Sequence, residues 1–161
     1  MIRDKNFSIV SCSPETLIEK KGDKIITKPI AGTLMKTKKT NIKRARHYFK
    51  NNIKETKEHN MIVDMERSDL SKFCKPGTVR FSKKKYVEEY KHLYHYVTKI
   101  EGRTKKNINT KDIITAMMPG GSVIGCPKIS TLNLLNLQEK ESRNIFTGSF
   151  GYIRFNGDMR F

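Results

Sequence analysis

Two glutamates, Glu55 and Glu58, lie one helical turn apart in a segment with the periodicity of a helix. Together with Ile62 and Met65 they follow the three-and-four spacing that places side chains on one helical face. This face combines apolar side chains that favour burial with two negative charges. Because burying an unpaired carboxylate is costly and a cation is the usual remedy, the spacing predicts a cation site at these two glutamates.

A second candidate is the glycine-rich segment 119–128, which leads into an expected helix. Free backbone N–H groups and the helix dipole at such a junction favour a bound anion. The segment does not match the Walker phosphate-binding loop, because Cys126 stands where lysine is required and Lys128 comes two residues later. Composition alone is equally compatible with an ordinary turn and with a cradle for a carboxylate or phosphate.

Two further residues could transfer protons. Glu15 follows a short expected strand, where rigid scaffolds often hold a general acid or base, although a solvated turn glutamate is the commoner interpretation. His95 falls in a segment expected to be helical, opposite an aromatic stripe that begins at Tyr86. Periodicity alone therefore predicts a solvated histidine.

The elements that must position these residues are predicted from turn, capping and alternation signals. In the first half of the chain we expect strands at 7–10 and 24–27 forming a hairpin around Lys21-Gly22-Asp23, a break at 29–33 and a polar stretch at 41–52. A helix over about 53–73, ended by Lys75-Pro76-Gly77, and a strand at 78–81 should follow. The rest of the chain predicts a long helix capped by Ser82, a helix capped by Thr110, a helix beginning near Pro127, and an aromatic-rich strand at 145–155 that enters a hairpin turn at Asn156-Gly157.

The chain has 161 residues, of which 36% are hydrophobic, enough for one ordinary domain with a core. Its net charge of +17, from 33 basic and 16 acidic residues, makes a polyanionic partner a first suspicion. The lysines are scattered, however, and neither a nucleic-acid-binding motif nor an aromatic platform for base stacking is recognisable. A basic nucleic-acid-binding module stays open as an alternative of a different class, but no nucleic acid partner is expected.

Three cysteines without CxxC spacing predict neither a disulfide framework nor a zinc site. Reduced thiols fit the cytoplasm best. No apolar run approaches the roughly 18 residues of a membrane span, and no signal-peptide region is recognisable. We therefore expect a soluble cytoplasmic protein with no membrane association.

Four segments in their order resemble the chorismate-utilising enzymes, specifically component I of anthranilate synthase and of aminodeoxychorismate (para-aminobenzoate) synthase. These segments are Ser13-Pro14-Glu15, Pro29-Ile-Ala-Gly-Thr33, Lys54-Glu55-x-x-Glu58-His59-x-Met61-x-Val63-Asp64 with Arg67-x-Asp69-Leu70, and Pro119-Gly-Gly-Ser-Val-x-Gly-x-Pro-Lys128. Weaker matches are Tyr94-His95-x-Val97 and Phe146-Thr-Gly148-Ser-Phe-Gly151-Tyr152. The resemblance extends over nearly the whole chain.

The resemblance implies a magnesium site and two catalytic residues. In the family a Mg²⁺ ion holds the carboxylate of chorismate, and Glu58 matches a glutamate ligand, with Glu55 one turn earlier. Glu15 matches the glutamate with a general-acid role beside the ring hydroxyl that leaves from C4. His95 matches the histidine associated with loss of the enolpyruvyl group as pyruvate, a role that periodicity would not assign to it.

The resemblance also implies contacts with the substrate. The matching positions are Gly32, Thr33, Gly121, Ser122, Lys128 and Phe146, the last standing where the family commonly has tyrosine. N–H, hydroxyl and ammonium groups suit a carboxylate. Ala31 is typical of anthranilate synthases, in which ammonia attacks C2 directly; some aminodeoxychorismate synthases use a lysine nucleophile at this position, and others also carry alanine.

The fold implied by the resemblance is α+β, with helices covering a large, mostly antiparallel sheet. The reaction implied is Mg²⁺-dependent amination of chorismate with pyruvate elimination, using ammonia from a glutamine amidotransferase partner. Residues 1–161 are expected to form part of a chorismate-binding catalytic domain. The family has an N-terminal portion before it and, beyond a segment like Gly157-Asp158-Met159, a substrate-binding arginine and further acidic metal ligands. We therefore expect the isolated chain to be inactive.

Overall fold

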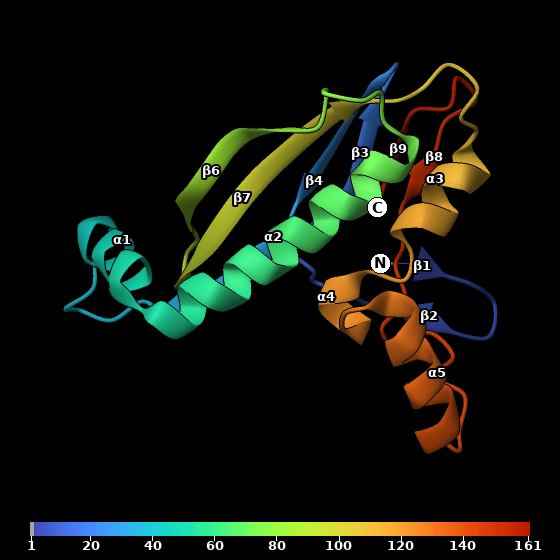
Figure 1. The fold of residues 1–161 in the computed structure, drawn as a ribbon. Helices are drawn as coiled ribbons and strands as arrows, with labels where there is room; N and C mark the ends of the chain where they lie inside the picture. The colour runs from blue at the N-terminus through green and yellow to red at the C-terminus, as the bar shows by residue number, and fades with distance from the viewer. Residues whose placement is uncertain (1) are drawn as a thin grey trace.

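The computed structural model describes residues 2–161 and shows helices packed against an antiparallel sheet (Figure 1). The strands are β1 (Ile2–Arg3), β2 (Ser8–Ile9), β3 (Thr16–Lys21), β4 (Lys24–Lys28), β5 (Ile30–Met35), β6 (Arg80–Glu89), β7 (Leu93–Arg103), β8 (Tyr152–Ile153) and β9 (Met159–Arg160). The helices are α1 (Ile42–Asn51), α2 (Ile53–Phe73), α3 (Thr110–Met117), α4 (Gly121–Ile124) and α5 (Lys128–Gln138). All described strand pairs are antiparallel, which confirms the expected α+β class.

Strand β7 is the centre of the sheet. Along one edge it pairs with β6, and along the other edge it pairs with β4 and β5, which lie end to end. Strands β3, β9 and β8 extend the sheet beyond β4. Most side chains of β7 are buried, so this strand holds its residues in fixed positions.

Helix α2 lies along the sheet, and its bounds confirm the helix expected over residues 53–73 (Figure 1). The Asn52 side chain caps its first turn by accepting a hydrogen bond from the Glu55 N–H at 3.1 Å. Its apolar side chains pack with those of β3, β4, β7 and α3; the buried members of this core include Ile18, Ile25, Val63, Leu70, Phe73, Ile100, Ile113 and Met117. None of the helices within residues 2–161 has both the length and the hydropathy that a membrane crossing requires.

The helix expected after Ser82 is wrong, because the segment forms the hairpin of β6 and β7. Tyr86 lies opposite Val97 across the two strands, and Glu89 lies opposite Tyr94. The side chains that suggested one helical stripe therefore come from two paired strands. Near-complete burial of β7 conceals the alternation that would otherwise indicate a strand.

The N-terminal strands also differ from expectation. A hairpin does turn at Gly22, whose φ of 59° suits glycine, but β4 pairs with β3 and not with residues 7–10. The latter include β2, which pairs with β1. The expected break at 29–33 lies mostly within β5, and most of the polar stretch 41–52 forms α1.

Several turn and capping signals near the C-terminal side lead to the expected elements. Helix α3 begins at Thr110, although Asn109 is its cap, in a capping box with Asp112. Pro127 immediately precedes α5, and the turn at residues 156–157 joins β8 to β9. The strand expected over 145–155 is confined to β8.

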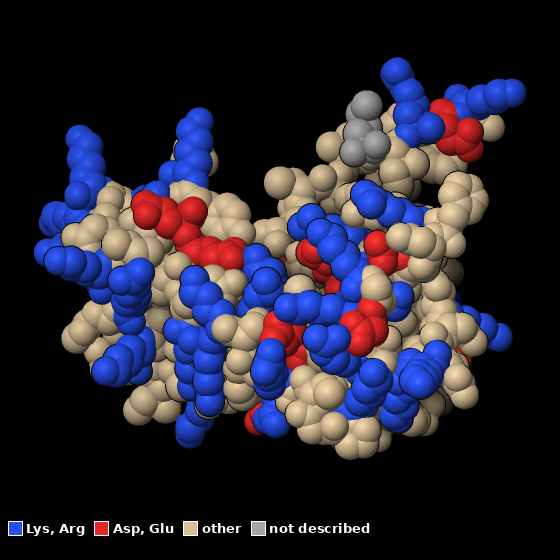
Figure 2. Space-filling model, turned by 90° about the horizontal axis from the view of Figure 1, so that it is seen from above, with Lys and Arg blue, Asp and Glu red and all other residues tan. Residues whose placement is uncertain are grey.

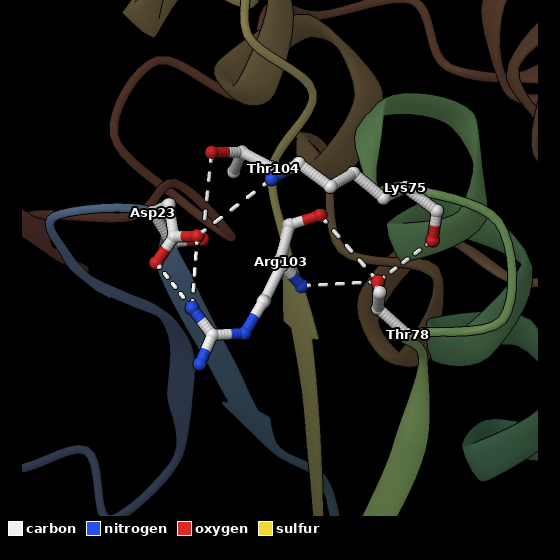
Figure 3. A network of polar contacts seen from close by, with 5 residues as sticks. All are labelled: Asp23, Lys75, Thr78, Arg103 and Thr104. Carbon is white, nitrogen blue, oxygen red and sulfur yellow. Dashed lines mark hydrogen bonds and ion pairs between the residues drawn. The ribbon is translucent and has the colours of Figure 1, made fainter.

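A polar network ties the β3–β4 turn to the end of β7 and to the connection after α2 (Figure 3). Arg103 donates through Nη1 to both carboxylate oxygens of Asp23, at 3.0 and 2.9 Å. The Arg103 N–H donates to the Thr78 hydroxyl, which donates to the Lys75 carbonyl at 2.7 Å. The hydrogen bond from Arg103 lowers the pKa of Asp23. This network fixes the end of the sheet that is formed by Lys24 and Arg103.

Candidate active site

Glu15 lies immediately before β3, and its carboxylate reaches across to the start of β5. Its Oε1 accepts a hydrogen bond from the Ile30 N–H at 3.0 Å. Burial raises the pKa of Glu15, and this hydrogen bond opposes the rise. A half-buried carboxyl group with a raised pKa keeps its proton to a higher pH, which is a property of a general acid.

Ser122 shares a cleft with Glu15. The cleft has a volume of about 360 Å³ and is lined by residues of three segments: 11–17, 120–123 and 148–152, together with Arg160 and Phe161. Gly121 does not line it; a Cβ at Gly121 would lie 1.8 Å from the Met65 Sδ, so glycine is required there for α4 to pack on α2. Phe146 lies outside the lining, with 71% of its surface exposed.

His95 and Thr33 are directly paired across β7 and β5. The Thr33 hydroxyl lies 3.1 Å from the His95 Nδ1, and 8% of the histidine surface is exposed. The solvated histidine predicted by periodicity is therefore wrong, since His95 occupies a strand and not a helix. The hydroxyl of Thr33 fixes the orientation of the imidazole ring.

Glu55 lies beside Gly32, the residue before Thr33. Gly32 has a φ of +113°, and a Cβ at this position would lie 2.9 Å from both Glu55 Oε2 and the Phe49 ring. Position 32 therefore requires glycine for two reasons: its φ is one that other residues rarely adopt, and a larger side chain would collide with Phe49 of α1 and Glu55 of α2. The contact brings the half-buried Glu55 carboxylate beside the β5 segment that carries Thr33.

Glu58 is exposed, so the expectation that Glu55 and Glu58 share a buried helical face is wrong for Glu58. Met65 of the expected face is buried, but the buried stripe of α2 otherwise passes through His59, Val63 and Glu66, one position further along the chain. Carboxylate oxygens one turn apart do suit Mg²⁺, which takes one or two protein carboxylates and retains several waters. Within residues 2–161 no three His, Cys, Asp or Glu side chains gather as a metal site, so other oxygen ligands would be needed.

Lys128 pairs with Asp69, a residue that sequence patterns did not single out as a functional group. The Lys128 Nζ forms an ion pair with Asp69 Oδ2 and donates to the carbonyls of Ala116 and Met117, at 3.3 and 3.1 Å. Asp69 is 4% exposed and also binds the Lys72 Nζ at 2.7 Å. The lysine thereby joins the start of α5 to α2 and to the last carbonyls of α3, where positive charge is favourable.

Glu66 is a buried carboxylate that the sequence analysis missed. It is 2% exposed, and its Oε2 accepts a hydrogen bond from the Thr27 hydroxyl at 2.6 Å. Burial raises the pKa of Glu66 to about 7; the Thr27 hydrogen bond opposes this rise, and the charges of Glu15 and Asp69 add to it. The only sequence signal for it was its place on the same spacing as Val63 and Leu70.

Glu66 is expected to make folding less favourable as the pH rises. Its carboxyl group ionises near pH 4.5 when unfolded and near 7 when folded, so in between only the folded chain keeps the proton. The free energy of unfolding should therefore fall by roughly 3 kcal/mol across this interval and level off above it. Glu66→Gln, which can still accept from Thr27, should remove this loss.

Urea unfolding at about pH 5 and about pH 8 tests the prediction for Glu66. The Gln variant should match the wild type at the lower pH and exceed it at the higher one. Glu141→Gln, at an exposed position, is the control and should follow the wild type. Equal pH dependence in the Glu66 variant and the wild type would contradict the assignment.

His59 braces α2 against the sheet. Its Nδ1 lies 3.1 Å from the Ala31 carbonyl and its Nε2 lies 2.7 Å from the Thr98 hydroxyl, with none of its surface exposed. Burial lowers its pKa, and the charge of Lys85 lowers it further, against the effect of the Ala31 hydrogen bond. A neutral ring that donates from Nδ1 and accepts at Nε2 satisfies both contacts.

His59→Ala should reduce the free energy of unfolding by about 3 kcal/mol, because it leaves a cavity and removes a partner from two buried polar groups. Urea unfolding near neutral pH measures the loss. His47→Ala provides a matched control, since His47 is exposed on α1, and should change stability by less than about 1 kcal/mol. Similar losses in the two variants would show that His59 is not such a brace.

The basic side chains do not form an uninterrupted surface in the view of Figure 2, where acidic groups lie among them. Several lysines of the sheet are paired: Lys24 with Glu101 at 2.8 Å and Lys28 with Glu88 at 2.8 Å. The pairing reduces the positive field that a polyanion would meet there.

The whole sequence, residues 1–161, matches the family described as chorismate binding enzyme. The chain is 37% identical over 157 residues to aminodeoxychorismate synthase component 1 of Bacillus subtilis, covering 97% of this chain and 33% of that protein. It is 35% identical over 155 residues to anthranilate synthase component 1 of Neisseria gonorrhoeae, covering 96% of this chain and 32% of that protein.

A solved structure has the same fold. The crystal structure of anthranilate synthase component I from Streptococcus pneumoniae superposes with a TM-score of 0.81 at 30% sequence identity, over 92% of this chain and 32% of that chain. The chain thus spans about a third of the length of these relatives. The match along its whole length, together with the shared fold, shows that this chain belongs to the chorismate binding enzyme family.

Proposed function

We propose that this chain supplies part of the catalytic site of an anthranilate synthase, which aminates chorismate with ammonia from a glutamine amidotransferase and releases pyruvate. The observation that carries the proposal is Glu15, a carboxyl group of raised pKa that lines a cleft of about 360 Å³. A protonated carboxyl in that position can give its proton to the hydroxyl that leaves C4 of the ring. Ser122, in the same cleft, offers a hydroxyl group to a substrate carboxylate.

His95 is proposed to act in the loss of the enolpyruvyl group. The Thr33 hydroxyl holds the imidazole at 3.1 Å, and the rigid pairing of β5 with β7 keeps both residues in place. A positioned imidazole can move a proton near neutral pH, which suits an elimination. Lys128 is proposed to be a positioning residue, because its ammonium group is already bound to Asp69 and to the end of α3.

Glu55 and Glu58 would hold the Mg²⁺ ion. When bound, the ion would neutralise the carboxylate of chorismate and stabilise charge in the transition state. The two side chains lie one turn apart on α2, with Glu55 beside Gly32. The chain's own contribution is to hold the Glu55 carboxylate close to the β5 segment.

Aminodeoxychorismate synthase is the alternative, because the relative of that name is as similar to this chain as the anthranilate synthases are, at 37% against 35% identity. Ala31 offers no nucleophile to the ring and is 5% exposed. This residue favours direct attack by ammonia, but it is compatible with either product.

A chimera can test the proposed function. Residues 1–161 would replace the matched segment of the Bacillus subtilis aminodeoxychorismate synthase component 1, and the chimera would receive chorismate, ammonium and Mg²⁺. Mass spectrometry of the products should identify anthranilate and pyruvate. Aminodeoxychorismate as the product would favour the alternative, whereas no turnover by a folded chimera, with an active parent enzyme as control, would contradict both.

A further inference from the structure

Tyr90, the residue after β6, lies against the imidazole of His95. The two ring centroids are 5.3 Å apart and the ring planes meet at 73°, an edge-to-face arrangement that aromatic rings favour. Thr33 contacts the Nδ1 of the same imidazole from β5, on the other side of β7. One hydrogen bond fixes one nitrogen of the ring, and the aromatic contact limits the tilt of the ring about that nitrogen.

The Tyr90 hydroxyl is itself held by the carboxylate of Glu88. It donates to Glu88 Oε2 at 2.9 Å, while the Tyr86 hydroxyl donates to Oε1 at 2.9 Å. The Lys28 Nζ reaches Oε1 from β4 at 2.8 Å. Glu88 lies directly opposite His95 across β6 and β7, so the two side chains project from the same face of the sheet. The carboxylate thus gathers these donors beside the histidine.

The contacts of Glu88 keep it charged and keep its donors protonated. Burial raises the pKa of Glu88, but the hydrogen bonds from Lys28, Tyr90 and Tyr86 outweigh burial and lower the pKa below its usual value. Burial and the hydrogen bond to Glu88 raise the pKa of Tyr90. At neutral pH a protonated hydroxyl therefore donates to an ionised carboxylate, and such a bond is stronger than one between neutral groups.

We propose that Tyr90 and Glu88 are positioning residues for His95: Glu88 holds the Tyr90 hydroxyl, and the Tyr90 ring holds the imidazole in the orientation that the loss of the enolpyruvyl group requires. This inference rests on the function proposed above for His95. Because Thr33 engages Nδ1, Nε2 is the nitrogen that can face a substrate, and its direction depends on the tilt of the ring. Proton transfer needs a close and aligned approach, so an error in that direction is costly.

The first test removes the Tyr90 hydroxyl and keeps the ring. Tyr90→Phe would be made in the 161-residue chain, and the imidazole protons of His95 would be followed by NMR, with His95→Asn to assign them. A neighbouring aromatic ring shifts these signals, so its release from Glu88 should move them. Tyr48→Phe is the matched control, because Tyr48 is 37% exposed against 38% for Tyr90 and makes a similar edge-to-face contact with Phe49. The control should leave the His95 signals in place.

The kinetics of the chimera give a second readout. Tyr90→Phe should lower kcat about tenfold and leave KM within about twofold, because the hydroxyl acts on the orientation of His95 and not on substrate binding. Glu88→Gln removes the charge that holds Lys28 and the tyrosines, and kcat should fall in the same way. A cluster that only stabilised the β6–β7 hairpin would give a lower Tm with kcat unchanged.

The two readouts separate this inference from the proposed function. Unchanged His95 signals in the Tyr90→Phe chain would overturn the inference, and so would a kcat within about twofold of that of an active, unsubstituted chimera. A folded chimera that releases no pyruvate even with Tyr90 and His95 intact would contradict the proposed function. In that case the NMR comparison would still decide whether Tyr90 orients His95.

Discussion

Glu15→Gln should lower the kcat of the chimera about 100- to 10,000-fold, because an amide cannot give a proton to the leaving hydroxyl group. The Gln side chain can still accept the hydrogen bond from the Ile30 N–H, so the local structure should persist. Substrate affinity should change little, since the lost interaction acts mainly in the transition state. The measurement is the initial rate of pyruvate release with ammonium as the nitrogen source.

Glu19→Gln is the control for Glu15→Gln. It changes a carboxylate on β3 that pairs with Lys21 and does not line the cleft. The control should keep the rate within about threefold. The pH profile offers a further check: because the pKa of Glu15 is raised and the acid must be protonated, kcat should decline as the pH rises through it. A fully active Glu15→Gln chimera would remove the residue from the mechanism.

Lys128→Met should reduce the free energy of unfolding by about 3 to 5 kcal/mol, the loss typical of breaking one side of a buried ion pair. The methionine retains an apolar stem but leaves Asp69, which is 4% exposed, without its less exposed cationic partner. It also leaves the carbonyls of Ala116 and Met117 without the donor that they share. Urea unfolding of the isolated chain measures the loss directly.

Lys72→Met is a matched control for this prediction, because Lys72 pairs with the other oxygen of the same carboxylate. Its side chain is 55% exposed, against 13% for Lys128. Solvent screening should limit the loss at Lys72 to less than about 1 kcal/mol. Comparable losses in both variants would mean that burial does not set the strength of the Lys128 contact.

The helix α2 was predictable from the sequence because its signals are local. Asn52 precedes it as a cap, and a Pro-Gly pair follows its end. Its buried face was harder to identify, since His59, Glu66 and Asp69 are polar residues whose partners come from distant segments. Helical spacing alone favoured a buried face through Glu58, whereas packing against the sheet buries its neighbour His59.

The β6–β7 hairpin was missed because near-complete burial of β7 conceals its alternation. The β5 strand could not be predicted because it pairs with β7, which is distant in the sequence. Thr33 and His95 are 62 residues apart, and no local pattern indicates that they meet. The candidate residues Glu15, His95 and Thr33 were instead found from the order of short motifs. The same motifs named Gly121, but only the structure gives the physical reason for glycine there, which is the closeness of the Met65 sulfur. Their roles toward chorismate and Mg²⁺ stay predictions.

The central place of β7 has a consequence for the order in which the protein folds. The hairpin of β3 and β4 and that of β6 and β7 each join neighbouring segments, so they can form early. Strands β4 and β5 can pair with β7 only after β7 has emerged from the ribosome. Glu15 can reach Ile30 before that moment, whereas His95 joins Thr33 only afterwards, so the two parts of the candidate active site are assembled at different times.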